Sequence, residues 1–194
     1  MSTPAPTPVP TSVATAVPNR VPQPSARPTP PERVAVLSLG SNLGDREQTL
    51  RAATAEVAAI DGVVLTAASP LVETPALKLH GVDHTAPAYL NAVLSVRTTL
   101  APEELLDAIN GIESAHGRVR DERWGDRTLD IDIVAFDNLE LATDDLTIPL
   151  PRAASRAFVL APWLEVDANA VLSGIPVAEL LTESPAVLAA EPLL

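Results

Sequence analysis

The chain has 194 residues, of which 46% are hydrophobic, and this is enough for one globular domain with a sizeable core. Its formal net charge of −12 argues against a nucleic acid or an anionic membrane as the main partner. The absence of cysteine excludes disulfide bonds and thiolate metal sites, and no stretch is long and apolar enough to cross a bilayer. We expect a cytoplasmic, monomeric protein.

Residues 1–32 differ in composition from the rest of the chain, being dominated by proline, threonine, alanine, valine and serine. Such a segment cannot bury enough apolar area to offset its ordering entropy, so we expect a disordered tail with polyproline character. It lacks a basic start followed by an unbroken apolar run, which argues against a signal peptide. Residues 33–194 are therefore expected to form a single domain.

The domain is predicted to begin with a strand and a helix. Residues 34–39 form a near-continuous apolar run, which is typical of a central strand buried on both faces. A glycine-bearing turn follows at 40–44, and Asp45 with Gln48 three residues later is the pattern of a helix N-terminus. The turn lacks both the Walker and the G-x-G-x-x-G patterns, so structural glycines are favoured over a phosphate cradle.

Two further strands are predicted, over 62–73 and 88–97, and the segment 74–87 between them is predicted to be a long loop. Alternation in the second of these strands places Tyr89 and Asn91 on one face. Such a pair is commonly just solvated. In a cleft it offers an aromatic wall and an amide that both donates and accepts, which suits a flat heterocycle.

The next helix begins at Pro102 and ends before Gly117. A turn and a short returning strand are expected over 138–141, a further edge strand over 146–149, and a short helix over 177–181. The order strand, helix, strand, strand, helix, strand predicts an α+β fold of the ferredoxin-like (βαββαβ) type. In this fold helices pack on an antiparallel sheet, and here C-terminal additions follow it.

The segment 118–137 carries the strongest chemical pattern. Residues 128–134 alternate polar and apolar, so Asp130 and Asp132 share one face of a strand. Two carboxylates about 6–7 Å apart repel by about 2–3 kcal/mol at an effective dielectric near 20, and a divalent cation between them reverses that sign. An isolated D-x-D pair is more often a solvated sheet face with ion-paired neighbours.

Four arginines immediately upstream favour a metal–phosphate site instead: Arg118, Arg120, Arg123 and Arg127. Guanidinium groups present planar forks of donors that match phosphate oxygens, and carboxylate oxygens suit Mg²⁺. Oxygen ligands and phosphate-binding cations side by side are what phosphoryl transfer requires.

Several motifs together resemble the 6-hydroxymethyl-7,8-dihydropterin pyrophosphokinase family. They are GSNLGD at 40–45, YLNAV at 89–93 and GRVRDERWGDRTLDIDIVAFD at 117–137, with LTIP at 146–149 and RAFVLAPWLEV at 156–166. The resemblance covers about residues 34–166 and leaves the tail outside. It implies a catalytic domain that transfers pyrophosphate from ATP to 6-hydroxymethyl-7,8-dihydropterin in folate biosynthesis, giving the pterin diphosphate and AMP.

The resemblance also implies a set of site residues. Two Mg²⁺ ions would be held by Asp130 and Asp132, with ATP as co-substrate and only small molecules as partners. The implied catalytic residues are Arg118, Arg127, Asp130 and Asp132. The implied ATP-binding residues are Asn110, Glu113, Arg118, Arg120, Arg127, Ile133, Thr147 and Arg156. The implied pterin-binding residues are Gly40, Thr74, Pro75, Leu77, Tyr89, Asn91, Trp124 and Phe158.

Two departures from the family pattern stand out. The position after the LTIP proline, where the family usually has a nucleotide-contacting histidine, is Leu150, and the loop 74–87 looks longer than usual. Another metal-dependent nucleotidyl or phosphoryl transferase on a ferredoxin-like fold is the main alternative. An RNA-binding module is disfavoured by the negative charge and by only 3% aromatic residues.

Overall fold

The computed structural model describes residues 30–78, 81–83, 85–117 and 128–184, so the predicted tail lies almost wholly outside the described residues. The helices are α1 (Arg46–Ala58), α2 (Pro102–Ala115), α3 (Ala157–Val166) and α4 (Val177–Glu183), with a 3-10 turn, η1 (Ala153–Ser155). The longer strands are β1 (Arg33–Ser41), β2 (Val63–Ala68), β6 (Tyr89–Thr98) and β7 (Asp130–Phe136). The shorter ones are β3 (Val72–Thr74), β4 (Ala76–Lys78), β5 (Gly81–Asp83), β8 (Leu141–Ala142), β9 (Thr147–Ile148), β10 (Val171–Leu172) and β11 (Ile175–Pro176).

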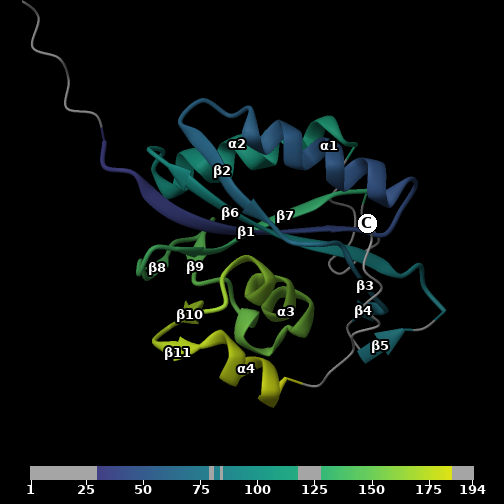
Figure 1. The fold of residues 1–194 in the computed structure, drawn as a ribbon. Helices are drawn as coiled ribbons and strands as arrows, with labels where there is room; N and C mark the ends of the chain where they lie inside the picture. The colour runs from purple at the N-terminus through teal and green to yellow at the C-terminus, as the bar shows by residue number, and fades with distance from the viewer. Residues whose placement is uncertain (1–29, 79–80, 84, 118–127, 185–194) are drawn as a thin grey trace, which may run out of the picture.

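The main sheet has the strand order β2-β6-β1-β7, with β3 also paired to β6, and every pairing in it is antiparallel. Helices α1 and α2 cover one face of this sheet, whereas α3 lies against the other face and α4 packs on α3 (Figure 1). The predicted antiparallel sheet with helices packed on it is therefore confirmed. Among the described residues, no helix combines the length and the apolar character that a membrane span requires.

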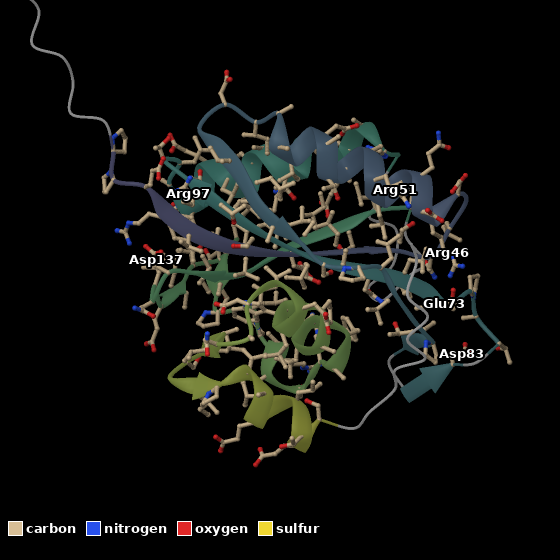
Figure 2. All side chains as sticks on the ribbon, in the orientation of Figure 1. Arg46, Arg51, Glu73, Asp83, Arg97 and Asp137 are labelled. Atoms are coloured by element: carbon tan, nitrogen blue, oxygen red, sulfur yellow. The ribbon has the colours of Figure 1, made fainter. Side chains whose placement is uncertain are left out.

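The beginning of β1 is fastened to the end of β7 by Asp137. Its Oδ1 accepts a hydrogen bond from the main-chain N–H of Val34 at 2.8 Å, and its Oδ2 pairs with Arg33 at 3.0 Å. Asp137 lies at the opposite end of the sheet from Arg46 and Glu73 (Figure 2). This contact closes the end of the sheet that lies away from the candidate site.

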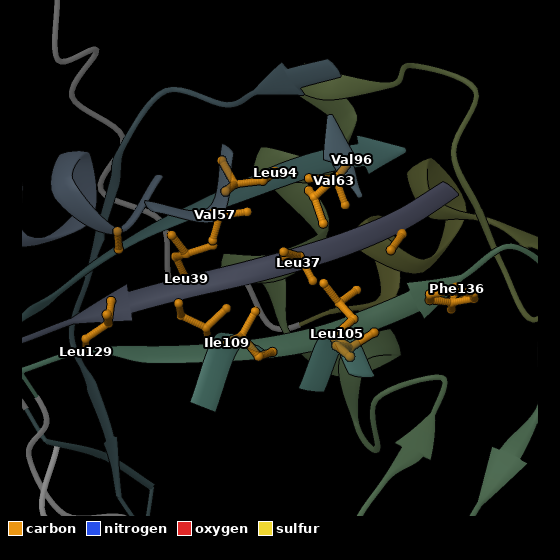
Figure 3. Close-up of a cluster of buried hydrophobic side chains, with 14 of the residues drawn as sticks. Leu37, Leu39, Val57, Val63, Leu94, Val96, Leu105, Ile109, Leu129 and Phe136 are labelled. Carbon is orange, nitrogen blue, oxygen red and sulfur yellow. The ribbon is translucent and has the colours of Figure 1, made fainter. Parts of the chain in front are cut away.

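The first hydrophobic core lies between the sheet and the α1–α2 layer (Figure 3). Leu37 and Leu39 of β1 point into it together with Leu50 and Val57 of α1 and Ile109 of α2. Helix α1 starts where its cap was predicted, because the side chain of Asp45 accepts from the N–H of Gln48 at 3.0 Å. Each helix packs on the sheet through one apolar face, which carries Leu50, Ala53 and Val57 in α1 and Leu105 and Ile109 in α2.

The second hydrophobic core lies on the other face of the sheet and is organised by α3. Val159, Leu160 and Trp163 of this helix are buried against Val36 and Val93 of the sheet. No element is predicted over this segment. The helix is apolar apart from Glu165 and contains Pro162. Because it has almost no polar face, it lacks the period of 3.6 on which a sequence-based prediction depends.

The predicted strand over 62–73 is in fact two strands, β2 and β3, which both pair with β6. The break falls at Ser69 and Pro70. The N–H and the Oγ of Ser69 form hydrogen bonds of 2.9 Å to the main chain of Val93, whereas Pro70 has no N–H to donate. The following segment was predicted to be a loop, and its described part contains the hairpin β4–β5, with Ala76 opposite Asp83.

The C-terminal elements agree in part with the sequence. The returning strand expected within 138–141 is β8, which begins only at Leu141, and the edge strand expected over 146–149 is β9. The two strands pair with each other rather than with the main sheet. The helix expected over 177–181 is observed as α4.

Candidate active site

Strand β7 presents Asp130 and Asp132 on the sheet face opposite to α1 and α2. The intervening Ile131 is only 3% exposed and lies in the first core, so the two carboxylates point the other way. Both aspartates are partly buried. The shared face that the alternation predicts is present in the structure.

Strand register joins these carboxylates to two other strands. Gly40 of β1 lies opposite Asp130 on one side and opposite Asn91 of β6 on the other. Ser38 in the same way lies between Asp132 and Val93. Because directly paired residues share a face, Asp130, Gly40 and Asn91 form one row across three strands spaced by about 4.8 Å.

Four of the residues implied for the pterin lie together at this end of the sheet. The amide nitrogen of Asn91 donates to the hydroxyl of Thr74 at 2.9 Å, which fixes the orientation of the amide. A Cβ atom at Gly40 would lie 3.3 Å from the Oδ1 of Asn91 and 3.7 Å from the ring of Tyr89. Glycine at position 40 is therefore explained by the closeness of these two side chains.

The turn between β1 and α1 anchors the chain just before Tyr89. Arg46 donates to the carbonyl of Ala88 at 2.7 Å and pairs with Glu73 at 3.2 Å, and Figure 2 shows these two charged side chains at the same end of the sheet. Asn42, which is 2% exposed, donates to the carbonyl of Pro87 at 3.3 Å. Arg46 and Asn42 are not among the site residues predicted from the sequence.

The sequence carries one signal for the contact made by Arg46. A cation in the first turn of a helix is unfavourable to the helix dipole, so Arg46 needs a compensating partner.

Residues implied for the nucleotide are distributed around the outer edge of β7. Glu113 of α2 is only 1% exposed and accepts from the main-chain N–H of Ile131 at 2.7 Å. Asn110 lies one turn earlier in the same helix. The side chain of Ile133 is buried in the first core, away from the carboxylate face. Thr147 is exposed on β9.

Arg156 and Phe158, which the resemblance assigns to different ligands, contact each other. The guanidinium carbon of Arg156 lies 5.8 Å from the centre of the Phe158 ring, at the beginning of α3. Leu150 packs against the second core, and its N–H donates to the carbonyl of Val134 at 2.9 Å. Arg118, Arg120, Trp124, Arg127 and the side chain of Leu77 lie outside the described residues.

The donor chemistry of the carboxylate face is suited to magnesium. Within the described part of the chain, no group of three or more His, Cys, Asp or Glu residues is placed to hold a metal ion. Asp130 and Asp132 are therefore a set of two carboxylates, which does not make a closed metal cage. Mg²⁺ is commonly bound in this way, by one or two carboxylates together with the phosphates of a substrate.

Comparison with known proteins identifies the family of this chain. Residues 36–168, more than half of the chain, match the family described as 7,8-dihydro-6-hydroxymethylpterin-pyrophosphokinase (HPPK). The chain belongs to the HPPK family. The match contains both aspartates, Gly40, Asn91 and Glu113.

Relatives named 2-amino-4-hydroxy-6-hydroxymethyldihydropteridine pyrophosphokinase match most of the HPPK domain. The protein of Bacillus subtilis is 41% identical over 133 residues, covering 69% of this chain and 77% of that protein. The protein of Methylorubrum extorquens is 37% identical over 149 residues, covering 77% of this chain and 92% of that protein. The protein of Mycobacterium tuberculosis is 42% identical over 162 residues, covering 76% and 82%.

Solved structures of HPPK-DHPS share the fold. The crystal structure of wild-type Plasmodium falciparum HPPK-DHPS with pterin and p-hydroxybenzoate has a TM-score of 0.61 at 15% identity and covers 81% of this chain. The crystal structure of the same protein with pteroate has a TM-score of 0.60 at 15% identity and covers 79%. This chain spans less than half of their length, 44% and 42% respectively.

Proposed function

We propose that this chain transfers pyrophosphate from ATP to 6-hydroxymethyl-7,8-dihydropterin in folate biosynthesis, giving the pterin diphosphate and AMP. The observation that carries the proposal is the position of Asp130 and Asp132. They lie between the Gly40–Asn91 row on one side and the outer edge of β7, with α2 beside it, on the other. An acceptor held on the first side and a nucleotide held on the second would meet at the two carboxylates.

Tyr89 and Asn91 are proposed to select the pterin. The orienting bond from the Asn91 amide to Thr74 leaves its Oδ1 beside Gly40, directed along the carboxylate row. An amide held in this way can recognise the donor and acceptor groups at the edge of a flat heterocycle. Pro75, Leu77, Trp124 and Phe158 are proposed to complete the pterin site.

The reaction is an in-line displacement. The hydroxymethyl oxygen of the pterin attacks the β-phosphorus of ATP and its proton is released to solvent. The bond from that phosphorus to the α–β bridging oxygen breaks, and AMP leaves with the electron pair. Magnesium held by Asp130 and Asp132 would neutralise the developing charge on the phosphate oxygens. We propose Arg118, Arg120, Arg127 and Arg156 as phosphate contacts, with Asn110, Ile133 and Thr147 on the nucleotide side.

We further propose that the fold is ferredoxin-like and that the enzyme acts as a cytoplasmic monomer. The order β7-β1-β6-β2 supports the first point, because the fourth, first, third and second long strands stand side by side. The net charge of −12 supports the second, since like-charged copies repel each other. Sedimentation at millimolar to micromolar protein would reveal a dimer if this is wrong.

The function is tested by measuring AMP release from ATP with and without 6-hydroxymethyl-7,8-dihydropterin in the presence of Mg²⁺. We expect AMP release to require the pterin and to be matched by an equal amount of pterin diphosphate, identified by its mass. AMP release that the pterin does not stimulate would favour the alternative, another metal-dependent nucleotidyl or phosphoryl transferase.

A further inference from the structure

We propose that Glu113 is a positioning residue, whose carboxylate holds the main chain of β7 between Asp130 and Asp132 and so fixes how the two carboxylates face a bound cation. This role rests on the proposed function. It differs from direct contact with the nucleotide, because Glu113 acts through the strand.

The contact that carries the proposal is short and buried. The Oε1 of Glu113 accepts from the N–H of Ile131 at 2.7 Å, and the glutamate is 1% exposed. Burying a carboxylate is costly unless hydrogen bonds compensate for the lost water, so a glutamate is not placed here by chance packing. Its bond reaches the one residue that separates the two aspartates.

The position of β7 in the sheet explains why this bond is needed. β7 is the last strand in the order β2-β6-β1-β7, so no strand among the described residues pairs with its outer edge in the main sheet. In an antiparallel pair, main-chain N–H groups point alternately toward the neighbouring strand and away from it. The bond of Ile131 goes to α2 rather than to β1, so Glu113 takes the place that a further strand would have.

The part of β7 that carries the aspartates is also short. The strand begins at Asp130, and its register with β1 shifts after Ile133, where Val134 is an extra residue opposite the partner strand. The regular segment consists of four pairs, which are Gly40 with Asp130, Leu39 with Ile131, Ser38 with Asp132 and Leu37 with Ile133. A strand end held by few pairs opens easily. The hydrogen bond to Glu113 holds this strand end at Ile131, between the two aspartates.

Three substitutions separate the hydrogen bond from the charge. Glu113→Gln removes the charge and keeps an oxygen acceptor at the same reach, whereas Glu113→Asp keeps the charge and shortens the side chain by one methylene. Glu104→Asp is the matched control: Glu104 lies in the same helix, and its carboxylate accepts from the N–H of Ala101 at 2.7 Å, away from β7.

Two measurements on the purified full-length protein read out the role without turnover. The first is the hydrogen-exchange rate of the Ile131 amide, followed by NMR in metal-free protein. The second is the Mg²⁺ concentration at which a non-hydrolysable ATP analogue binds half-maximally, measured by calorimetry. Groups that orient metal ligands typically change metal affinity about 10- to 100-fold when they are lost.

We expect Glu113→Asp to raise the exchange rate of the Ile131 amide and the required Mg²⁺ concentration about tenfold or more. For Glu113→Gln and Glu104→Asp we expect both values to be close to those of the parent protein. The proposal is overturned if Glu113→Gln raises the exchange rate and the required Mg²⁺ concentration as much as Glu113→Asp does. The charge of Glu113 would then matter rather than its hydrogen bond. It is also overturned if Glu113→Gln weakens analogue binding at saturating Mg²⁺, since this indicates direct contact with the nucleotide.

If Glu113→Asp does not fold, Glu113→Gln is compared with the parent protein alone. An unchanged exchange rate and an unchanged Mg²⁺ requirement then support the hydrogen bond over the charge, and a rise of about tenfold in either overturns the proposal. Failure of the proposed function would be seen in a separate measurement, in which AMP release by the parent protein does not respond to the pterin.

Discussion

Replacing Asp132 by asparagine removes one of the two charges on the carboxylate face and keeps the shape of the side chain. Residues two apart on a strand are separated by about 6.6 Å, so the two charges repel by about 2.5 kcal/mol at an effective dielectric of about 20. Both side chains are partly exposed, and solvent screening reduces this to about 1 kcal/mol or less. The metal-free variant should therefore unfold at the same temperature as the parent or up to about 4 °C higher.

Activity should respond in the opposite direction. A cation that neutralises phosphate charge contributes several kcal/mol to transition-state stabilisation, so weakening its site by about 3–4 kcal/mol lowers turnover by roughly 150- to 1,000-fold. The assay is AMP release from ATP with the pterin, measured over a range of Mg²⁺ concentrations. Asp130→Asn should lower turnover by a similar factor. The double variant should lower it hardly more than either single variant, because two groups that hold one site act as a unit.

Two results would refute this reasoning. Turnover of Asp132→Asn within about threefold of the parent at the same Mg²⁺ concentration is far below the change of roughly 150-fold expected above. A loss of more than about 2 kcal/mol in the free energy of unfolding would show that the carboxylate is held in stabilising contacts, as in the alternative of an ion-paired sheet face.

Three further predictions concern other parts of the chain. Leu150→His is expected to tighten ATP binding, and an unchanged nucleotide dissociation constant would contradict this expectation. The same change should lower the free energy of unfolding by about 1 kcal/mol, because the leucine is partly buried on the second core. Arg46→Gln removes the bond to the carbonyl of Ala88 and should raise the KM for the pterin about fivefold with little change for ATP; equal effects on both substrates would count against a local role. Deleting residues 1–32 should leave turnover unaltered, because the only described contact that it removes is an exposed ion pair from Glu32 to Arg97 at 3.8 Å; a large loss of kcat would assign the tail a role in catalysis.

Patterns that repeat along a single element are predictable from the sequence. The alternation around Asp130 and Asp132 gives the correct face for both carboxylates, and the same argument places Tyr89 and Asn91 on the face of β6 opposite to the first hydrophobic core. The cap of α1 at Asp45 is equally local, since it joins residues three apart. In each case the physical cause lies within a few residues of its effect.

Elements without such a pattern are not predictable in this way. Helix α3 is buried on nearly every side and contains Pro162, so no polar face marks its period. The break between β2 and β3 depends on Ser69 bonding to Val93, which is 24 residues away. The extra residue at Val134 in β7 is visible only against its partner strand.

The sequence by itself determined which side chains β7 offers on each face, because backbone geometry forces alternation on any strand. Only the tertiary structure decided what those side chains meet. The row from Asp130 through Gly40 to Asn91 depends on the order of three strands, and the bond from the Ile131 N–H to Glu113 joins residues 18 apart on two different elements. Such contacts are set by how helices and strands pack around a shared core, and no local period encodes them.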